Sequence, residues 1–60
     1  PTNYLIQLRI EKAKELIRTT DLTINEVAYA VGYVVARYFS KLFIKIVGIK
    51  PVEYRRFYAK

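Results

Sequence analysis

The chain has 60 residues, enough for one small domain that buries only about 60% of its unfolded surface. It has no cysteine and no histidine, so disulfides and thiolate metal sites are excluded, and metal chemistry would need carboxylates alone. The net charge is +6, and all of it comes from residues 34–60, where seven basic residues accompany one acidic residue; residues 1–33 carry four of each sign. A basic charge confined to one part of a chain favours a polyanionic partner. No apolar run approaches the roughly 20 residues of a membrane span.

The first predicted element is a helix over residues 1–19. Pro1 suits a first helical position, where its missing N–H group costs nothing. Glu11 and Glu15 lie on the polar side, where we expect them to pair with Lys12 and Arg18. Apolar residues at helical spacing predict the buried stripe: Leu5, Ile6, Leu8, Ile10, Ala13, Leu16 and Ile17. The segment 19–21 ends this helix.

A second helix is predicted over residues 23–31. Thr23 and Glu26 have the spacing of a capping box, in which each side chain accepts a hydrogen bond from the backbone N–H group of the other. Gly32 then allows the positive φ angle of a turn. The expected buried face of this helix is Ile24, Val27, Ala28 and Val31.

Two further helices complete the chain, over residues 35–47 and 51–58. Gly48 ends the first of them, and Pro51 begins the second. The expected inward residues are Phe39, Leu42, Phe43, Ile46 and Val47, then Tyr54, Phe57 and Tyr58. No strand-like alternation competes, so we predict an all-α fold. Residues 1–60 would form a single domain, a small bundle of about four helices that contains a helix-turn-helix.

The third helix has an outward face that suits a nucleic acid. Arg37, Lys41 and Ile44 point away from the buried stripe, and Ser40 and Lys45 flank them. Arginine can form two hydrogen bonds with guanine, and a serine hydroxyl can donate or accept. A basic face that is merely solvated is the alternative interpretation.

Three exposed aliphatic positions, Val34, Val35 and Ile44, leave further alternatives open. They could pack locally, with Val35 against the second helix, or they could contact thymine methyl groups. They could also form a protein-binding patch with Arg37 and Lys41 as a charged rim. Such a patch is what deliberate redesign would leave, so an engineered binder that occupies a partner's cleft is the alternative function.

The sequence also resembles a known family. The string LRIEKAKELIRTTDLTINEVAYAVGY, followed by YFSKLF and GIKPVEYRR, is similar to the C-terminal DNA-binding region of AraC-type bacterial transcription activators. The resemblance covers essentially the whole chain. Members carry two helix-turn-helix units joined by a long helix. By this resemblance residues 1–19 are the joining helix, 23–31 the first motif helix, 35–47 the recognition-type helix and 51–58 the closing helix.

The resemblance implies a DNA-binding half-module whose recognition helix lies in the major groove of double-stranded DNA in the bacterial cytoplasm. The closing P-x-x-Y-R element is mainly structural in the family, with Arg55 a candidate phosphate contact. The residues themselves offer no converging base, nucleophile or metal-binding set, so we expect no enzyme activity, cofactor, metal, membrane or small-molecule substrate. Where the family usually has polar residues, this chain has Val34, Val35 and Ile44. The candidate DNA-binding residues are Ala36, Arg37, Ser40, Lys41, Lys45 and Arg55.

Overall fold

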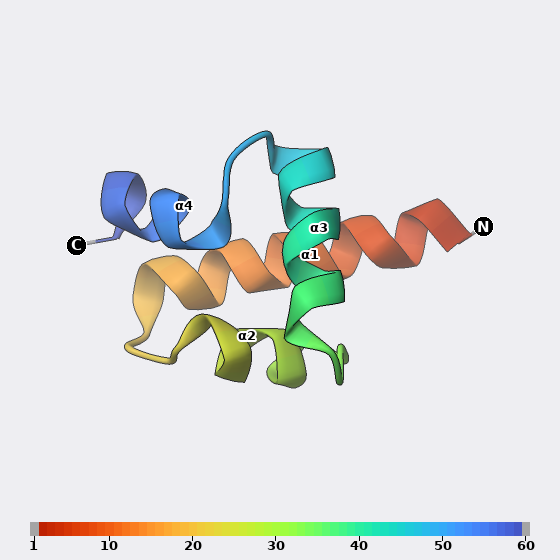
Figure 1. Cartoon of the computed structure of the whole chain (residues 1–60), viewed down its shortest axis with the longest axis horizontal. Coiled ribbons are helices and arrows are strands. Elements are labelled where there is room, and N and C mark those ends of the chain that lie inside the picture. The colour runs from red at the N-terminus through yellow and green to blue at the C-terminus, as the bar shows by residue number, and fades with distance from the viewer. Residues whose placement is uncertain (1, 60) are drawn as a thin grey trace.

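The computed structural model describes residues 2–59, which form four α-helices and, within that range, no strand (Figure 1). The helices are α1 (Thr2–Thr19), α2 (Ile24–Ala30), α3 (Ala36–Val47) and α4 (Pro51–Tyr58). The predicted all-α fold is confirmed. Thr23 and Val35, placed inside helices by the sequence, are instead N-cap residues with extended backbone, because a cap residue lies only half inside its helix. Pro1, the expected start of the first helix, lies outside the described residues.

The longest helix, α1, is the scaffold of the fold, because it packs against each of the other three. In Figure 1, α3 runs across α1, while α2 and α4 lie on opposite sides of α1 in this view. This arrangement leaves one side of α3 facing away from the rest of the protein. None of the helices in residues 2–59 combines the length and apolar character that crossing a membrane requires.

The hydrophobic core is built from one stripe of each helix. On α1 the fully buried residues are Ile10, Ala13 and Ile17, spaced three and four residues apart as expected for a single helix face. Val27 and Ala28 of α2 close the core from one side. These residues were all predicted to be buried.

Aromatic side chains connect the turn, α3 and α4 in one row. The ring centroids of Tyr33 and Phe39 are 5.9 Å apart, those of Phe39 and Phe43 5.8 Å, and those of Phe43 and Tyr54 5.6 Å. Aromatic pairs at these separations contribute about 0.5–1.5 kcal/mol beyond the area they bury. The row therefore fixes α3 between the turn that precedes it and the helix that closes the fold.

Several predicted core positions are wrong. Leu5 and Leu8 are about half-exposed, because the first turns of α1 extend beyond the other helices (Figure 1). Ile46 is 42% exposed at the far end of α3. Phe57 is 69% exposed and Tyr58 is also exposed, because the two-turn helix α4 buries only a narrow face.

The ion pairs on α1 also differ from the prediction. Lys14 pairs with Glu11 at 3.0 Å, and Lys12 pairs with Glu15 at 3.4 Å. Arg18 instead donates a hydrogen bond from Nη1 to the Tyr54 hydroxyl at 3.0 Å. Arg18 therefore joins α1 to α4, whereas the pairs on the α1 surface contribute little to stability.

Candidate nucleic-acid interface

The start of α2 is fixed by the predicted capping box. The Thr23 hydroxyl accepts a hydrogen bond from the Glu26 N–H group at 3.1 Å, and the Glu26 carboxylate accepts one from the Thr23 N–H group at 2.8 Å. Two N–H groups that the helix cannot satisfy internally are thereby paired. This prediction is confirmed, and it sets where the helix-turn-helix begins.

The turn between α2 and α3 has a Schellman geometry centred on Gly32. The Tyr33 N–H group donates to the Ala28 carbonyl oxygen at 2.8 Å, and the Gly32 N–H group donates to that of Tyr29 at 3.1 Å. Gly32 has a φ angle of +103°, which side-chain-bearing residues rarely adopt. The turn therefore requires this glycine to aim the chain into α3.

The residue after the turn glycine anchors α3 to α1. Tyr33 is buried, and the guanidinium carbon of Arg9 lies 5.2 Å from its ring centroid. This separation is within the range of a cation–π contact. Arg9 and Tyr33 are 24 positions apart in the chain, so no local sequence signal predicts this contact.

The segment that leads into α3 is apolar and uncovered. Val34 is 85% exposed and Val35 is 59% exposed. Val35 is the N-cap residue, and its side chain makes no capping hydrogen bond. The prediction that Val34 and Val35 pack locally is therefore wrong. Contact with thymine methyl groups and a protein-binding patch stay open for these two valines.

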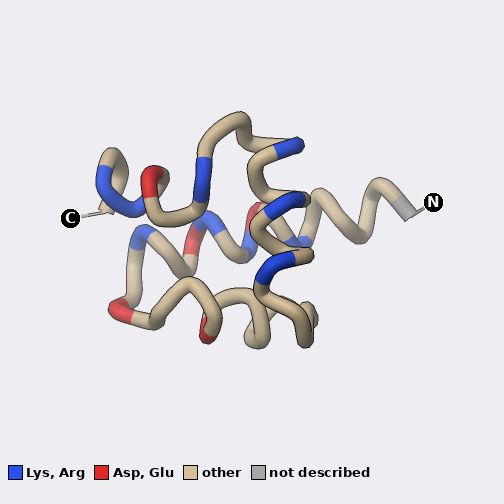
Figure 2. Tube along the Cα trace, viewed as in Figure 1, with Lys and Arg blue, Asp and Glu red and all other residues tan. Residues whose placement is uncertain are grey.

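The outward side of α3 carries a row of cations, which we call the basic face: Arg37, Lys41 and Lys45. All three are exposed, and they follow one another at intervals of four residues on the side away from Phe39 and Phe43. A rise of 1.5 Å per residue places the first and last about 12 Å apart along the helix. None of the three forms an ion pair within residues 2–59. Figure 2 shows basic positions on successive turns of α3 and no acidic position on that helix.

The remaining candidates on α3 lie at the edges of the basic face. Ala36 and Ser40 are half-buried, and Ile44 is 40% exposed. Ser40 and Ile44 line a mainly apolar hollow of about 290 Å³, together with Ile24, Lys50, Pro51 and Val52. The structure thus brings Ala36, Ser40 and Ile44 next to the three cations.

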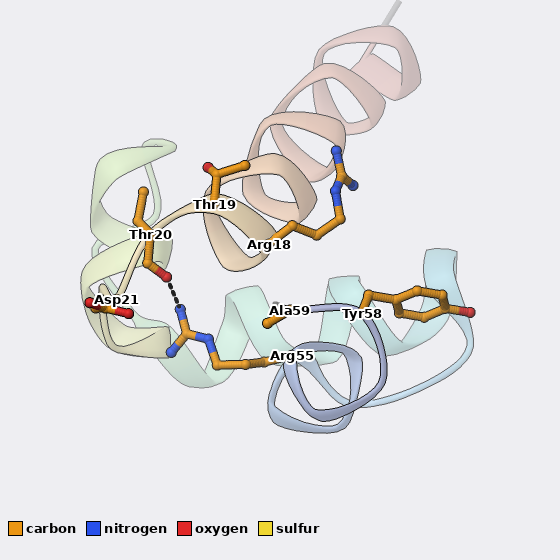
Figure 3. Close-up of a pocket in the computed structure, with 7 residues that line it drawn as sticks. All are labelled: Arg18, Thr19, Thr20, Asp21, Arg55, Tyr58 and Ala59. Atoms are coloured by element: carbon orange, nitrogen blue, oxygen red, sulfur yellow. Dashed lines mark hydrogen bonds between the residues drawn. The ribbon is translucent and has the colours of Figure 1, made fainter.

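Arg55 is not part of this surface. Its guanidinium donates to the carbonyl oxygens of Ile17, at 3.5 Å, and Thr20, at 3.3 Å, at the end of α1. It borders another hollow, of about 710 Å³, to which no residue of α3 contributes (Figure 3). Arg55 therefore holds α4 against α1, and a phosphate contact by this residue stays a prediction. The lining of this hollow is Arg18, Thr19, Thr20, Asp21, Arg55, Tyr58 and Ala59.

The acidic side chains of the described part of the chain do not form a further site. Within residues 2–59, no three Asp, Glu, His or Cys side chains lie close enough to hold a metal ion. Glu26 is used by the cap of α2, and the Glu53 carboxylate accepts a hydrogen bond from the Lys50 N–H group at 3.2 Å at the start of α4.

Comparison with known proteins explains this arrangement. Residues 1–56 match the model of a helix-turn-helix domain family, the AraC-type helix-turn-helix. The chain belongs to this family. It is 43% identical over 56 residues to the uncharacterized HTH-type transcriptional regulator YdiP of Escherichia coli, covering 93% of this chain and 18% of that protein. It is 39% identical over 56 residues to the MmsAB operon regulatory protein of Pseudomonas aeruginosa, with the same coverage of both chains.

Solved structures of the family have the same fold. The C-terminal domain of the two-component response regulator yesN from Fusobacterium nucleatum superposes with a TM-score of 0.88 at 44% identity, covering 90% of this chain and 52% of that one. The C-terminal domain of AraT, a response regulator from Geobacillus stearothermophilus, gives a TM-score of 0.89 at 44% identity, covering 92% of this chain and 46% of that one.

The AraC-type chain described here spans about half of those domains and about a fifth of the curated relatives. It is one helix-turn-helix half-module of the DNA-binding type. None of these relatives supports the alternative of an engineered protein-binding module.

Proposed function

We propose that the chain binds double-stranded DNA, with α3 lying in the major groove, as a half-module of a bacterial transcription regulator. The observation that carries this proposal is the basic face, three exposed cations on a helix that has no acidic residue. An α-helix with its side chains is about 10–12 Å wide, and the major groove is about 12 Å wide. The turn and α1 hold this face outward, as groove entry requires.

The position of each side chain along α3 suggests its role. Arg37 lies in the first turn, where recognition helices reach base edges, and its guanidinium can pair with guanine O6 and N7. Lys41 follows one turn later and can reach a base edge or a phosphate. Lys45 lies two turns from Arg37 and suits a phosphate. Ala36 and Ser40, half-buried beside the cations, would influence which base is accepted.

The proposed function is binding, not catalysis. The similar proteins YdiP and the MmsAB operon regulatory protein are bacterial, so the proposed place of action is the DNA of a bacterial cytoplasm. A half-module with about two phosphate contacts, from Lys41 and Lys45, binds weakly. Its affinity should fall with salt along a log–log slope of about −1.8, which corresponds to roughly 0.9 per neutralised phosphate.

Fluorescence anisotropy on a labelled duplex of about 20 bp, titrated at several salt concentrations, tests the proposal. Lys41→Ala should weaken binding and reduce the slope by about one. Lys12→Ala is the matched control, because it removes the same charge from an exposed position on α1. Absence of salt-dependent binding, or an equal loss in both variants, would reject α3 as the DNA-binding element.

A further inference from the structure

The segment just before α3 carries two aliphatic side chains that the rest of residues 2–59 leaves largely exposed. Val34 and Val35 are 85% and 59% exposed, and Arg37 follows them within one turn. Recognition helices contact base edges with their N-terminal residues. Under the proposed function, Val34 and Val35 therefore lie close to the base edges of the major groove.

We propose that Val34 and Val35 contact the C5-methyl groups of thymine, so that the chain prefers A·T pairs beneath the start of α3. This inference rests on the proposed function and adds a specificity to it. In the major groove, the thymine methyl is the apolar group among edges that otherwise present donors and acceptors. A valine over such a donor or acceptor would remove its water without supplying a hydrogen bond, which disfavours G·C pairs there.

The shape of valine supports this role. Its β-branched side chain has few accessible rotamers, so little conformational freedom is lost when it is fixed against a methyl group. Burial of one methyl-sized group is worth about a fourfold change in affinity. Two valines over two thymines can thus add a measurable preference to a weak, mainly electrostatic interaction.

The charges beside the valines favour DNA as the binding partner. Arg37 and Lys41 lie on the same helix, which carries no acidic residue. Exposed cations without acidic neighbours complement the phosphates of DNA, which lie beside the base edges of the groove. An apolar contact followed by exposed cations on the same helix therefore matches a thymine methyl group next to the phosphate backbone.

The test compares two duplexes of about 20 bp that contain only A·T pairs in mixed order, one with thymine and one with uracil at every T position. Uracil lacks the C5-methyl group and keeps the hydrogen-bonding edge. A methyl group in every register makes the comparison independent of where the chain binds. A second comparison uses a C·G duplex with cytosine or with 5-methylcytosine, which carries its methyl at the same place in the groove.

The wild-type chain should bind the thymine duplex about fourfold or more tighter than the uracil duplex, and should prefer 5-methylcytosine over cytosine. The variant Val34→Ser/Val35→Ser should lose this ratio to less than twofold. Serine is a favourable N-cap residue, so the double variant keeps α3 folded. Leu5→Ser on α1, a similarly exposed aliphatic residue far from α3, should retain the wild-type ratio.

The outcomes separate this inference from the proposed function. Equal wild-type affinity within either pair of duplexes, with salt-dependent binding retained, would overturn the methyl contact alone. A double variant that keeps the wild-type ratio would also overturn it. Failure of the wild-type chain to bind any duplex would overturn both. Self-association in sedimentation that the double variant abolishes would assign the valines to a second copy of the chain.

Discussion

The guanidinium of Arg55 on α4 donates a hydrogen bond to the carbonyl oxygen of Thr20, across a distance of 3.3 Å, just beyond the end of α1 (Figure 3). The same side chain also reaches the Ile17 carbonyl oxygen. The last carbonyl groups of a helix have no partners within it, and a cation near them interacts favourably with the helix dipole. Arg55 therefore stabilises the end of the scaffold helix.

Loss of this contact should weaken the fold. We expect Arg55→Ala to lower the free energy of unfolding by about 1–2 kcal/mol, because hydrogen bonds from a charged donor are lost. Arg56→Ala is the matched control: the neighbouring arginine is exposed, so its effect should stay within about 0.5 kcal/mol. Urea denaturation followed by circular dichroism measures both, and equal effects would contradict the structural role of Arg55.

Two buried tyrosines should respond in opposite directions to the same substitution. Within the described residues, the Tyr33 hydroxyl is buried without a hydrogen-bond partner, whereas that of Tyr54 accepts a hydrogen bond from Arg18. Tyr33→Phe should raise the free energy of unfolding by about 1 kcal/mol, and Tyr54→Phe should lower it by a similar amount. Urea denaturation at constant pH tests this difference, and shifts of the same sign in both variants would refute it.

The start of α3 lacks a capping side chain. Val35→Ser should therefore stabilise the fold by about 1 kcal/mol, because serine can accept a hydrogen bond from an N–H group of the first turn. For a chain of this size, that gain corresponds to an increase in Tm of about 4–8 °C. Val35→Ala shortens the side chain without adding a cap, so it should give no such gain. Thermal melts compare the two, and equal Tm values would contradict the capping argument.

Two isoleucines on α3 offer a matched test of its two sides. Ile44 and Ile46 have nearly equal exposure, 40% and 42%, and differ by about 200° around the helix. Ile44→Lys should tighten DNA binding at low salt and steepen the log–log salt slope by about 0.9, because it adds a cation beside the basic face. Ile46→Lys adds the same charge to the other side and should change the slope little. Equal gains would show that total charge, not position, controls binding.

Much of the fold could be predicted because its signals are local. The Thr23–Glu26 capping box and the turn at Gly32 depend on residues a few positions apart. The stripe of Ile10, Ala13 and Ile17 follows from helical periodicity.

The positions and contacts that the sequence did not predict depend on how the helices pack against one another. Periodicity gives the apolar side of a helix, but not how much of that side a neighbour covers. Leu5, Leu8 and Ile46 therefore looked buried although they lie beyond the contacts of their helices. The contacts of Arg9, Arg18 and Arg55 join residues 24 to 38 positions apart, so no local sequence pattern predicts them.

For the candidate site, helical geometry predicted which residues of α3 face outward. The exposure of Arg37, Lys41 and Ile44 agrees with that geometry, whereas Val34 and Val35 precede the helix. Helical geometry does not indicate which molecule contacts these residues. The roles of the individual DNA-binding residues therefore stay predictions.

The proposed DNA-binding surface is the outward face of α3, and its location can be observed residue by residue. The most direct measurement is the amide nitrogen–proton NMR spectrum of the labelled chain during titration with duplex DNA at low salt. If α3 binds DNA, the largest shift changes should fall on residues 34–45, with Arg37 and Lys41 among them. Changes centred on the first half of α1 or on α4, with the amides of α3 unmoved, would contradict it.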